Sequence, residues 1–369
     1  KHQQTTLDDL PKFVNVIAEQ MGDQRHDRLL LTLIEHMKDG GHLSQRVKVV
    51  TLQFFTQMLK KSRQAMDDAE SSDLSEMQQR MSDPDQLHCT PLMILLAEGH
   101  DDVVAYQAVE FGKQLFHGGN EVAQKAVLAN FEEVDGGFFG KVVEKMHKCI
   151  KVLRERKREK QFMEDNELEE DKVYGYKQML DNKMELSGIP AVLRLLQLFC
   201  EGHYGPLQNY LRVQPNCLHS VNIIAEVLFF LREVLHAGID ETTIDMAIQC
   251  FNTLTEFCQG PCAPNQATLM DLKPNVCSEV NIVLESELPT VEDALAFELR
   301  NSAVLTLLSL LEGNTKKHHL LLMISTLSFP VLGRTLDEMW RMEEEDALNL
   351  AFNLYVLLCC LSREETRSP

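Results

Sequence analysis

The stretch AVLRLLQLFCEGHYGPLQNYLR (residues 191–212) contains the pattern that decides the fold. Apolar residues recur near the 3.6-residue helical period as far as Cys200, and then a glutamate, a glycine and a histidine follow before a second helical run. A glycine directly after a helix adopts the left-handed conformation at little cost, and short links of this kind join antiparallel helices. The stretch therefore predicts two consecutive helices joined by a tight glycine turn.

The same combination of an apolar run followed by a glycine turn recurs along the chain. It appears as HMKDGGH (36–42), LLAEGH (95–100), LFHGGN (115–120) and LLEGN (310–314), each after an apolar run. Strand-like alternation is scarce, and Thr90-Pro91 is typical of a helix N-cap followed by the first helical residue. These features predict an all-α fold, an irregular armadillo- or HEAT-like helical solenoid, with a compact all-helical domain as the alternative.

A charged segment divides the helical pattern. The stretch RERKREKQFMEDNELEEDK (154–172) changes from a basic block to an acidic one, which is typical of a solvated helix extension or a linker. We therefore expect an N-terminal helical-repeat half (1–153), a charged linker or helix extension (154–175) and a C-terminal helical half (176–369).

Composition limits the classes of partner. The chain has 36 Lys and Arg against 56 Asp and Glu, a net charge of -20, which argues against binding to nucleic acid or to an anionic membrane surface. No 18-residue apolar run and no signal peptide are present, so no segment is expected to span a membrane. The absence of an initiator Met suggests a piece of a longer chain. Ten cysteines, several inside apolar runs, indicate buried free thiols in a reducing compartment.

The sequence contains none of the catalytic motifs GxSxG, GxxxxGKS/T, HExxH or GxGxxG, so we expect no enzyme activity. Cys258 and Cys262 lack a second pair with zinc spacing, and no segment has the spacing of an EF-hand loop.

Two glutamates at helix ends are the remaining candidates for chemistry. Glu201 and Glu256 each stand at the end of an apolar run that a glycine terminates. A carboxylate is disfavoured there because a helix C-terminus carries partial negative charge, but a cation would reverse that penalty. Calcium takes the carboxylate and carbonyl oxygens that helix ends offer. Two solvated glutamates without a ligand are the alternative.

The stretches LRLLQLFCEGHYGPLQNYLRVQPN (193–216) and FNTLTEFCQGPCAPNQ (251–266) resemble the associated homology domain of intracellular calcium-release channels, the inositol trisphosphate and ryanodine receptors. The motif CEGH is closer to ryanodine receptors, and TEFCQGPC is closer to inositol trisphosphate receptors. No EF-hand loop separates LLEGN from the helix that begins AFNLYVLL (351–358), which favours an inositol trisphosphate receptor.

This resemblance implies a cytosolic regulatory and relay domain of a homotetrameric, ligand-gated channel, on the cytoplasmic face of the endoplasmic reticulum. Its partners would be other cytosolic domains of the same channel, especially the pore-proximal C-terminal domain. The resemblance implies a regulatory calcium ion at that interface, with Glu201 and Glu256 as ligands and His203 and Gln259 nearby, bound weakly in this chain alone. The alternatives are the equivalent domain of a ryanodine receptor and an independent helical-repeat scaffold that binds protein partners.

Overall fold

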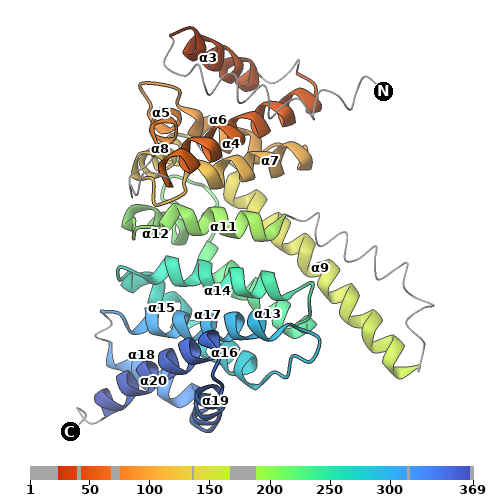
Figure 1. Cartoon of the computed structure of the whole chain (residues 1–369), viewed down its shortest axis with the longest axis vertical. Coiled ribbons are helices and arrows are strands. Elements are labelled where there is room, and N and C mark those ends of the chain that lie inside the picture. The colour runs from red at the N-terminus through yellow and green to blue at the C-terminus, as the bar shows by residue number, and fades with distance from the viewer. Residues whose placement is uncertain are drawn as a thin grey trace. The chain divides into compact units, whose positions relative to one another are not determined.

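All the regular structure that the computed structural model describes is helical. The described residues are 24–39, 43–67, 75–134, 137–166, 188–313 and 316–365, and they contain 17 helices and no strand (Figure 1). The predicted all-α helical-repeat fold is confirmed. The chain divides into two compact units: unit 1 comprises Lys1–Lys141, Leu198–Leu207 and Asn216–Leu218, and unit 2 comprises Val142–Gln197, Gln208–Pro215 and His219–Pro369.

Unit 1 contains the N-terminal helices, which pack against one another. Its helices are α3 (Gln24–Lys38), α4 (Gln45–Asp67), α5 (Glu76–Ser82), α6 (Cys89–Ala97), α7 (Asp102–Leu115), α8 (Glu121–Glu133) and the first four residues of α9 (Phe138–Asp165). Helix α7 packs against α4 and α6, and α8 packs against α6. The side chains of Asp101 and Asn120 cap α7 and α8, because each accepts hydrogen bonds from backbone N–H groups of the first turn.

The predicted N-cap at Thr90 is wrong. Helix α6 begins at Cys89, two residues before the predicted start at Pro91, and its N-cap is His88 in the left-handed conformation with φ of 45°. Thr90 is fully buried inside the helix. Packing of the apolar run against the core has therefore extended the helix past the position that the local sequence favoured.

Unit 2 contains the remaining helices. They are most of α9 and α11 (Ile189–Cys200), part of α12 (Gly205–Arg212), α13 (Ile223–Ala237), α14 (Ile244–Cys258), α15 (Ala263–Asp271), α16 (Val276–Glu285), α17 (Asp293–Leu311), α18 (Lys317–Thr326), α19 (Phe329–Arg341) and α20 (Glu345–Glu365). Helix α14 packs against α13 and α17, α17 packs against α16 and α20, and α19 packs against α20. Asn222 and Asn275 cap α13 and α16 through their side-chain oxygens.

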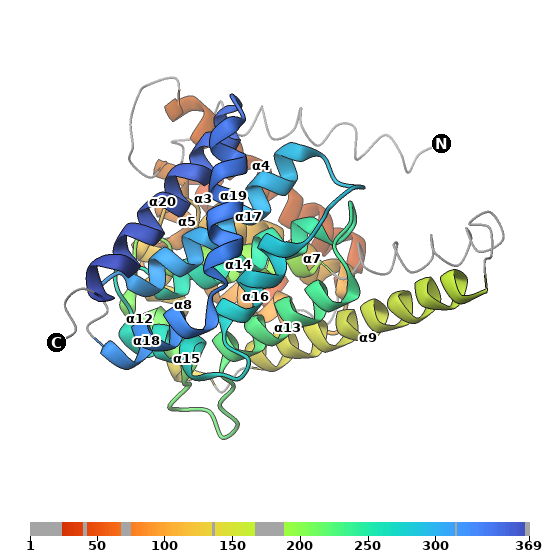
Figure 2. The same ribbon diagram turned by 90° about the horizontal axis from the view of Figure 1, so that it is seen from below.

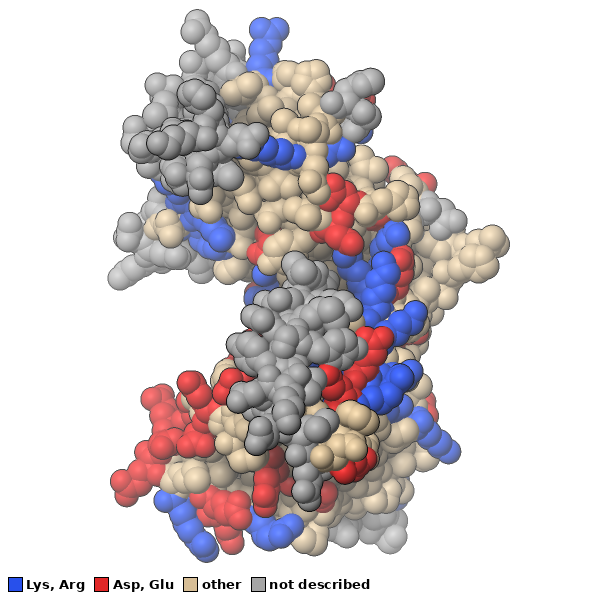
Figure 3. Space-filling model, turned by 90° about the vertical axis from the view of Figure 1, so that its right-hand side faces the viewer, with Lys and Arg blue, Asp and Glu red and all other residues tan. Residues whose placement is uncertain are grey.

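The basic block at the start of the predicted charged segment continues helix α9. Residues 154–165 are helical, and residues 167–175 lie outside the described residues. Within unit 2, α9 runs alongside α13 (Figure 2). Arg154 binds both carboxylate oxygens of Glu233 (2.7 and 2.8 Å), and the Lys157 amine donates to the His236 carbonyl at 2.6 Å. Basic and acidic side chains lie next to one another near the centre of the face drawn in Figure 3. Within the basic block, Arg154 and Arg156 are thus paired with carboxylates of unit 2.

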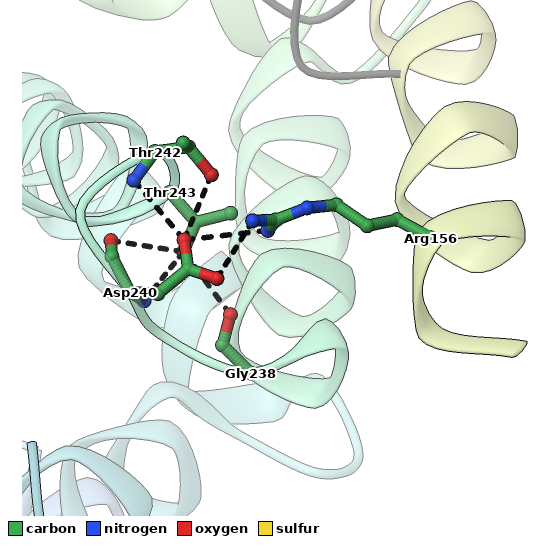
Figure 4. A network of polar contacts seen from close by, with 5 residues as sticks. All are labelled: Arg156, Gly238, Asp240, Thr242 and Thr243. Atoms are coloured by element: carbon green, nitrogen blue, oxygen red, sulfur yellow. Dashed lines mark hydrogen bonds and ion pairs between the residues drawn. The ribbon is translucent and has the colours of Figure 1, made fainter. Parts of the chain in front are cut away.

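A polar network fixes the turn between α13 and α14. Arg156 pairs with the Asp240 carboxylate at 2.8 Å, and Thr242 donates to the same carboxylate through its N–H and its hydroxyl (Figure 4). The Thr243 hydroxyl donates to the Gly238 carbonyl at 3.0 Å. Burial would raise the pKa of Asp240, but the hydrogen bonds from Arg156 and Thr242 lower it below its usual value.

The cysteines fit the expectation of buried thiols. All ten are free, and seven of them are buried. Burial raises the pKa of Cys89 and of Cys277 to about 12, so these thiols stay protonated and unreactive.

Two described helices are long and apolar enough to cross a membrane, namely α17 and residues 345–362 of α20, and the pair α18 and α19, bent by 73°, would make a third. The lack of an 18-residue apolar run therefore does not by itself exclude a span. The apolar window of α17 is 56% buried inside the protein, and α14, α16 and α20 all pack against this helix. For α17, packing rather than composition argues against a place in lipid.

Candidate functional site

The glycine turns predicted from the sequence take the left-handed conformation at four helix ends. The φ angles are 74° at Gly118, 76° at Gly202, 104° at Gly260 and 57° at Gly313, after helices α7, α11, α14 and α17. Gly99, in the AEGH tetrapeptide, is absent from this left-handed set. The two EGH sequences of the chain therefore form different turns.

Glu201 lies in unit 1, directly after the last residue of α11. Its side chain is half-buried, and its Oε2 atom is buried. Its backbone carbonyl accepts a hydrogen bond of 2.8 Å from the Gln124 side-chain amide of α8. The LFHGGN turn also lies against it, because a Cβ atom added at Gly119 would come within 3.3 Å of the Glu201 carbonyl oxygen. The backbone that carries Glu201 is thus fixed from two sides within unit 1.

An aromatic cluster anchors the helix end two residues before Glu201. Phe199 is fully buried, and its ring lies 4.8 Å from the ring of Phe116 and 6.1 Å from the rings of Phe131 and Phe138. Aromatic pairs at these separations add about 0.5–1.5 kcal/mol each beyond the burial of their area. The Glu201 turn therefore follows directly on a buried aromatic cluster of unit 1.

His203 continues the same turn in an uncommon conformation. Its φ is 62°, directly after left-handed Gly202, and its N–H donates to the Cys200 carbonyl at 2.9 Å. A non-glycine residue in this region costs roughly 1–2 kcal/mol, since its Cβ approaches the following carbonyl. The side chain is exposed, so the imidazole is accessible from solvent.

Glu256 and Gln259 lie together in unit 2. Glu256 is in the last turn of α14 and Gln259 is its C-cap residue. Both side chains are half-buried, and the Oε2 atom of Glu256 is buried. The Gln208 side-chain amide of α12 donates to the carbonyls of Glu256 (2.9 Å) and Gln259 (2.8 Å), and Asn265 donates to the Phe257 carbonyl at 2.8 Å.

The four predicted calcium residues are thus divided into two pairs. Glu201 and His203 share the turn after α11 in unit 1, while Glu256 and Gln259 share the end of α14 in unit 2. Among the described residues, no three His, Cys, Asp or Glu side chains form a group that could hold a metal ion. Each pair supplies one carboxylate, a donor that calcium favours.

The sequence predicts that backbone carbonyls at these helix ends are open to calcium, and the structure shows them with other partners. Those of Glu201, Glu256 and Gln259 already accept hydrogen bonds from buried glutamines. Helix C-termini leave carbonyls unsatisfied, and the side-chain amides fill that need. Each of these carbonyls thus accepts a hydrogen bond, and the half-buried carboxylates of Glu201 and Glu256 are the charged oxygen groups at the two helix ends.

Glu98, the glutamate of AEGH, has a different role. In unit 1 its carboxylate accepts hydrogen bonds from the backbone N–H groups of Gly137 and Phe138, where α9 begins. Burial raises the pKa of Glu98, and these two hydrogen bonds act in the opposite direction. A carboxylate at a helix N-terminus is a capping interaction, so the local structure accounts for Glu98 without a metal ion.

A family model described as "RyR and IP3R Homology associated" matches residues 183–284. All four candidate residues and Gln208 lie within this match. This part of the chain is therefore similar to the associated homology domain of the ryanodine and inositol trisphosphate receptors, as the sequence resemblance predicted.

A comparison with curated proteins bears on which of the two receptor types the chain is more similar to. The chain is 34% identical over 140 residues to "Inositol 1,4,5-trisphosphate receptor itr-1" of Caenorhabditis elegans. The aligned region is 35% of this chain and 5% of that protein, so the chain corresponds to a small part of this relative. This similarity favours the inositol trisphosphate receptor branch, as predicted.

Proposed function

We propose that this chain is a cytosolic regulatory and relay domain of an inositol trisphosphate receptor-type calcium-release channel, on the cytoplasmic face of the endoplasmic reticulum. The observation that carries the proposal is the family match over residues 183–284, which contains both helix ends with a candidate glutamate. The partners are other cytosolic domains of the same homotetrameric channel, above all the pore-proximal C-terminal domain.

Within that function, Glu201 and Glu256 are calcium ligands, and His203 and Gln259 lie close to the ion. The half-buried carboxylates supply the hard oxygen donors that calcium prefers, and each stands on a fixed helix end. Two carboxylates provide at most about four oxygens, whereas calcium takes about six to eight. This chain alone would therefore bind calcium weakly, and the pore-proximal domain would complete the shell.

Calcium in such a site acts as a clamp between two rigid bodies. It can shift the channel only by as much as its affinity differs between the clamped and the unclamped states. The domain would thus convert calcium concentration into a change in the population of open channels.

The test is the calcium response of the full-length channel carrying Glu201→Gln together with Glu256→Gln. We expect the calcium concentration for half-maximal activation to rise about tenfold, within the usual range of allosteric coupling. Glu98→Gln is the matched control, because Glu98 also precedes a glycine and a histidine but caps α9. An unchanged response in the double variant would refute the calcium assignment.

A protein-binding scaffold is the second candidate, favoured by an exposed aromatic group in unit 2. Trp340 of α19 is 69% exposed, and Phe352 and Tyr355 of α20 are 62% and 59% exposed. Aromatic side chains are enriched at protein interfaces. This candidate predicts that the chain captures a partner without other channel segments, and that serine substitutions at Trp340 and Phe352 abolish the capture.

A further inference from the structure

Four buried glutamines make the same pair of contacts. Each donates its side-chain amide to two backbone carbonyls at the end of a neighbouring helix in its own unit. The pairs are Gln78 with Leu115 and His117 (3.1 and 2.6 Å), Gln124 with Leu198 and Glu201 (3.3 and 2.8 Å), Gln208 with Glu256 and Gln259 (2.9 and 2.8 Å), and Gln266 with Ser309 and Glu312 (both 2.9 Å). All four side chains are 5% exposed or less.

Three of these glutamines share a sequence position. Gln124, Gln208 and Gln266 each stand six residues after a left-handed glycine, at Gly118, Gly202 and Gly260. Each is also the fourth residue of its helix, α8, α12 or α15. The spacing turns the side chain inward after the glycine turn, so the contact is a repeated feature of the solenoid.

We propose that Gln124 and Gln208 are positioning residues for the calcium site, because they hold the helix ends that carry Glu201 and Glu256. This inference rests on the proposed function. A side-chain amide has two N–H donors, and here both are used on carbonyls that the helix leaves unsatisfied. The turn is therefore fixed before any ion binds.

Fixing the turn should increase the affinity for calcium. When the binding-competent geometry is only partly populated, the apparent dissociation constant rises in inverse proportion to that population. Loss of the amide would remove one hydrogen bond from each of two carbonyls and let the turn sample other orientations. The glutamates would remain present but would be held less often in the binding geometry.

The test compares Gln124→Met and Gln208→Met with Gln266→Met as the matched control. The control loses the same contact at the end of α17, which carries no candidate calcium residue. Amide hydrogen exchange without calcium should rise at the affected helix end in all three variants. In the full-length channel, only the first two should raise the calcium concentration for half-maximal activation, by about three- to tenfold.

Equal calcium responses in Gln208→Met and Gln266→Met would overturn the proposal. If the Met variants do not fold, Gln208→Asn and Gln266→Asn serve instead, because a side chain one methylene shorter cannot reach both carbonyls. A shift from Glu201→Gln and Glu256→Gln without one from the Gln124 and Gln208 variants overturns only the positioning role. No shift from the glutamate variants overturns the proposed calcium site and the positioning role together.

Discussion

A buried ion pair between α13 and α16 allows a quantitative prediction about the stability of the homology domain. The Arg232 guanidinium donates to the Glu279 carboxylate at 2.8 Å and to the Pro274 carbonyl at 2.8 Å. Glu279 is 1% exposed, and its Oε2 atom has no hydrogen-bond partner among the described residues. Arg232 is therefore the group that compensates a buried negative charge.

Replacing Arg232 with Met should cost about 3–5 kcal/mol of unfolding free energy, because it leaves the Glu279 charge buried and uncompensated. Arg154→Met is the matched control, since the Arg154 side chain is 52% exposed in its pair with Glu233. An exposed pair contributes less than about 1 kcal/mol. Urea unfolding followed by far-ultraviolet circular dichroism gives both values, and amide exchange in α13 and α16 localises the effect.

The double variant Arg232→Met with Glu279→Met separates charge from packing. Two apolar side chains of similar volume remove both charges, so we expect most of the loss to be recovered. A loss below about 1 kcal/mol in Arg232→Met, or a double variant as unstable as the single one, would refute the reasoning.

Three further predictions follow from single side chains. Burial raises the pKa of Glu98 above the unfolded value of about 4.5, so wild-type stability relative to Glu98→Gln should fall as the pH rises from the unfolded pKa through the raised folded pKa. Urea unfolding measures this difference, and a difference that grows with pH would contradict the prediction. The pKa of Asp240 is lowered in the folded state, so the contribution of its ionised carboxylate to stability is present above about pH 4 and is lost on acidification through the folded pKa. Asp240→Asn should therefore lower the unfolding free energy by about 1–3 kcal/mol at neutral pH and by little in acid, as measured by urea unfolding. His203→Gly should raise the unfolding temperature. It relieves about 1–2 kcal/mol of left-handed backbone strain, which exceeds the cost of about 0.5–1 kcal/mol for ordering a more flexible glycine on folding. A lowered unfolding temperature would contradict this and would show that the imidazole makes a stabilising contact.

The sequence was sufficient for features that depend on neighbouring residues. The 3.6-residue periodicity and the glycines at helix ends are local signals, and they correctly predicted the helices around Gly118, Gly202, Gly260 and Gly313. The N-cap of α6 was missed, because burial of Thr90 in the helix outweighs its capping preference.

Contacts between distant residues could not be predicted in the same way. Gln208 is 48 residues from Glu256 in the sequence. Glu98 is about forty residues from the backbone N–H groups that donate hydrogen bonds to its carboxylate. A glutamine six residues after a glycine is a visible signal, but its partner carbonyls are set by which helices pack together. The spacing becomes meaningful only when three copies of it make the same contact.

The two EGH turns show how one short sequence acquires two roles. At Glu98 the neighbouring structure is the N-terminus of α9, whose N–H groups donate to the carboxylate, while its buried Oε1 atom has no hydrogen-bond partner among the described residues. At Glu201 a glutamine amide of α8 donates to the backbone carbonyl, and the Oε2 atom of the carboxylate is buried. The two glutamates therefore differ in the group that the neighbouring helix contacts, which is the carboxylate at Glu98 and the backbone carbonyl at Glu201.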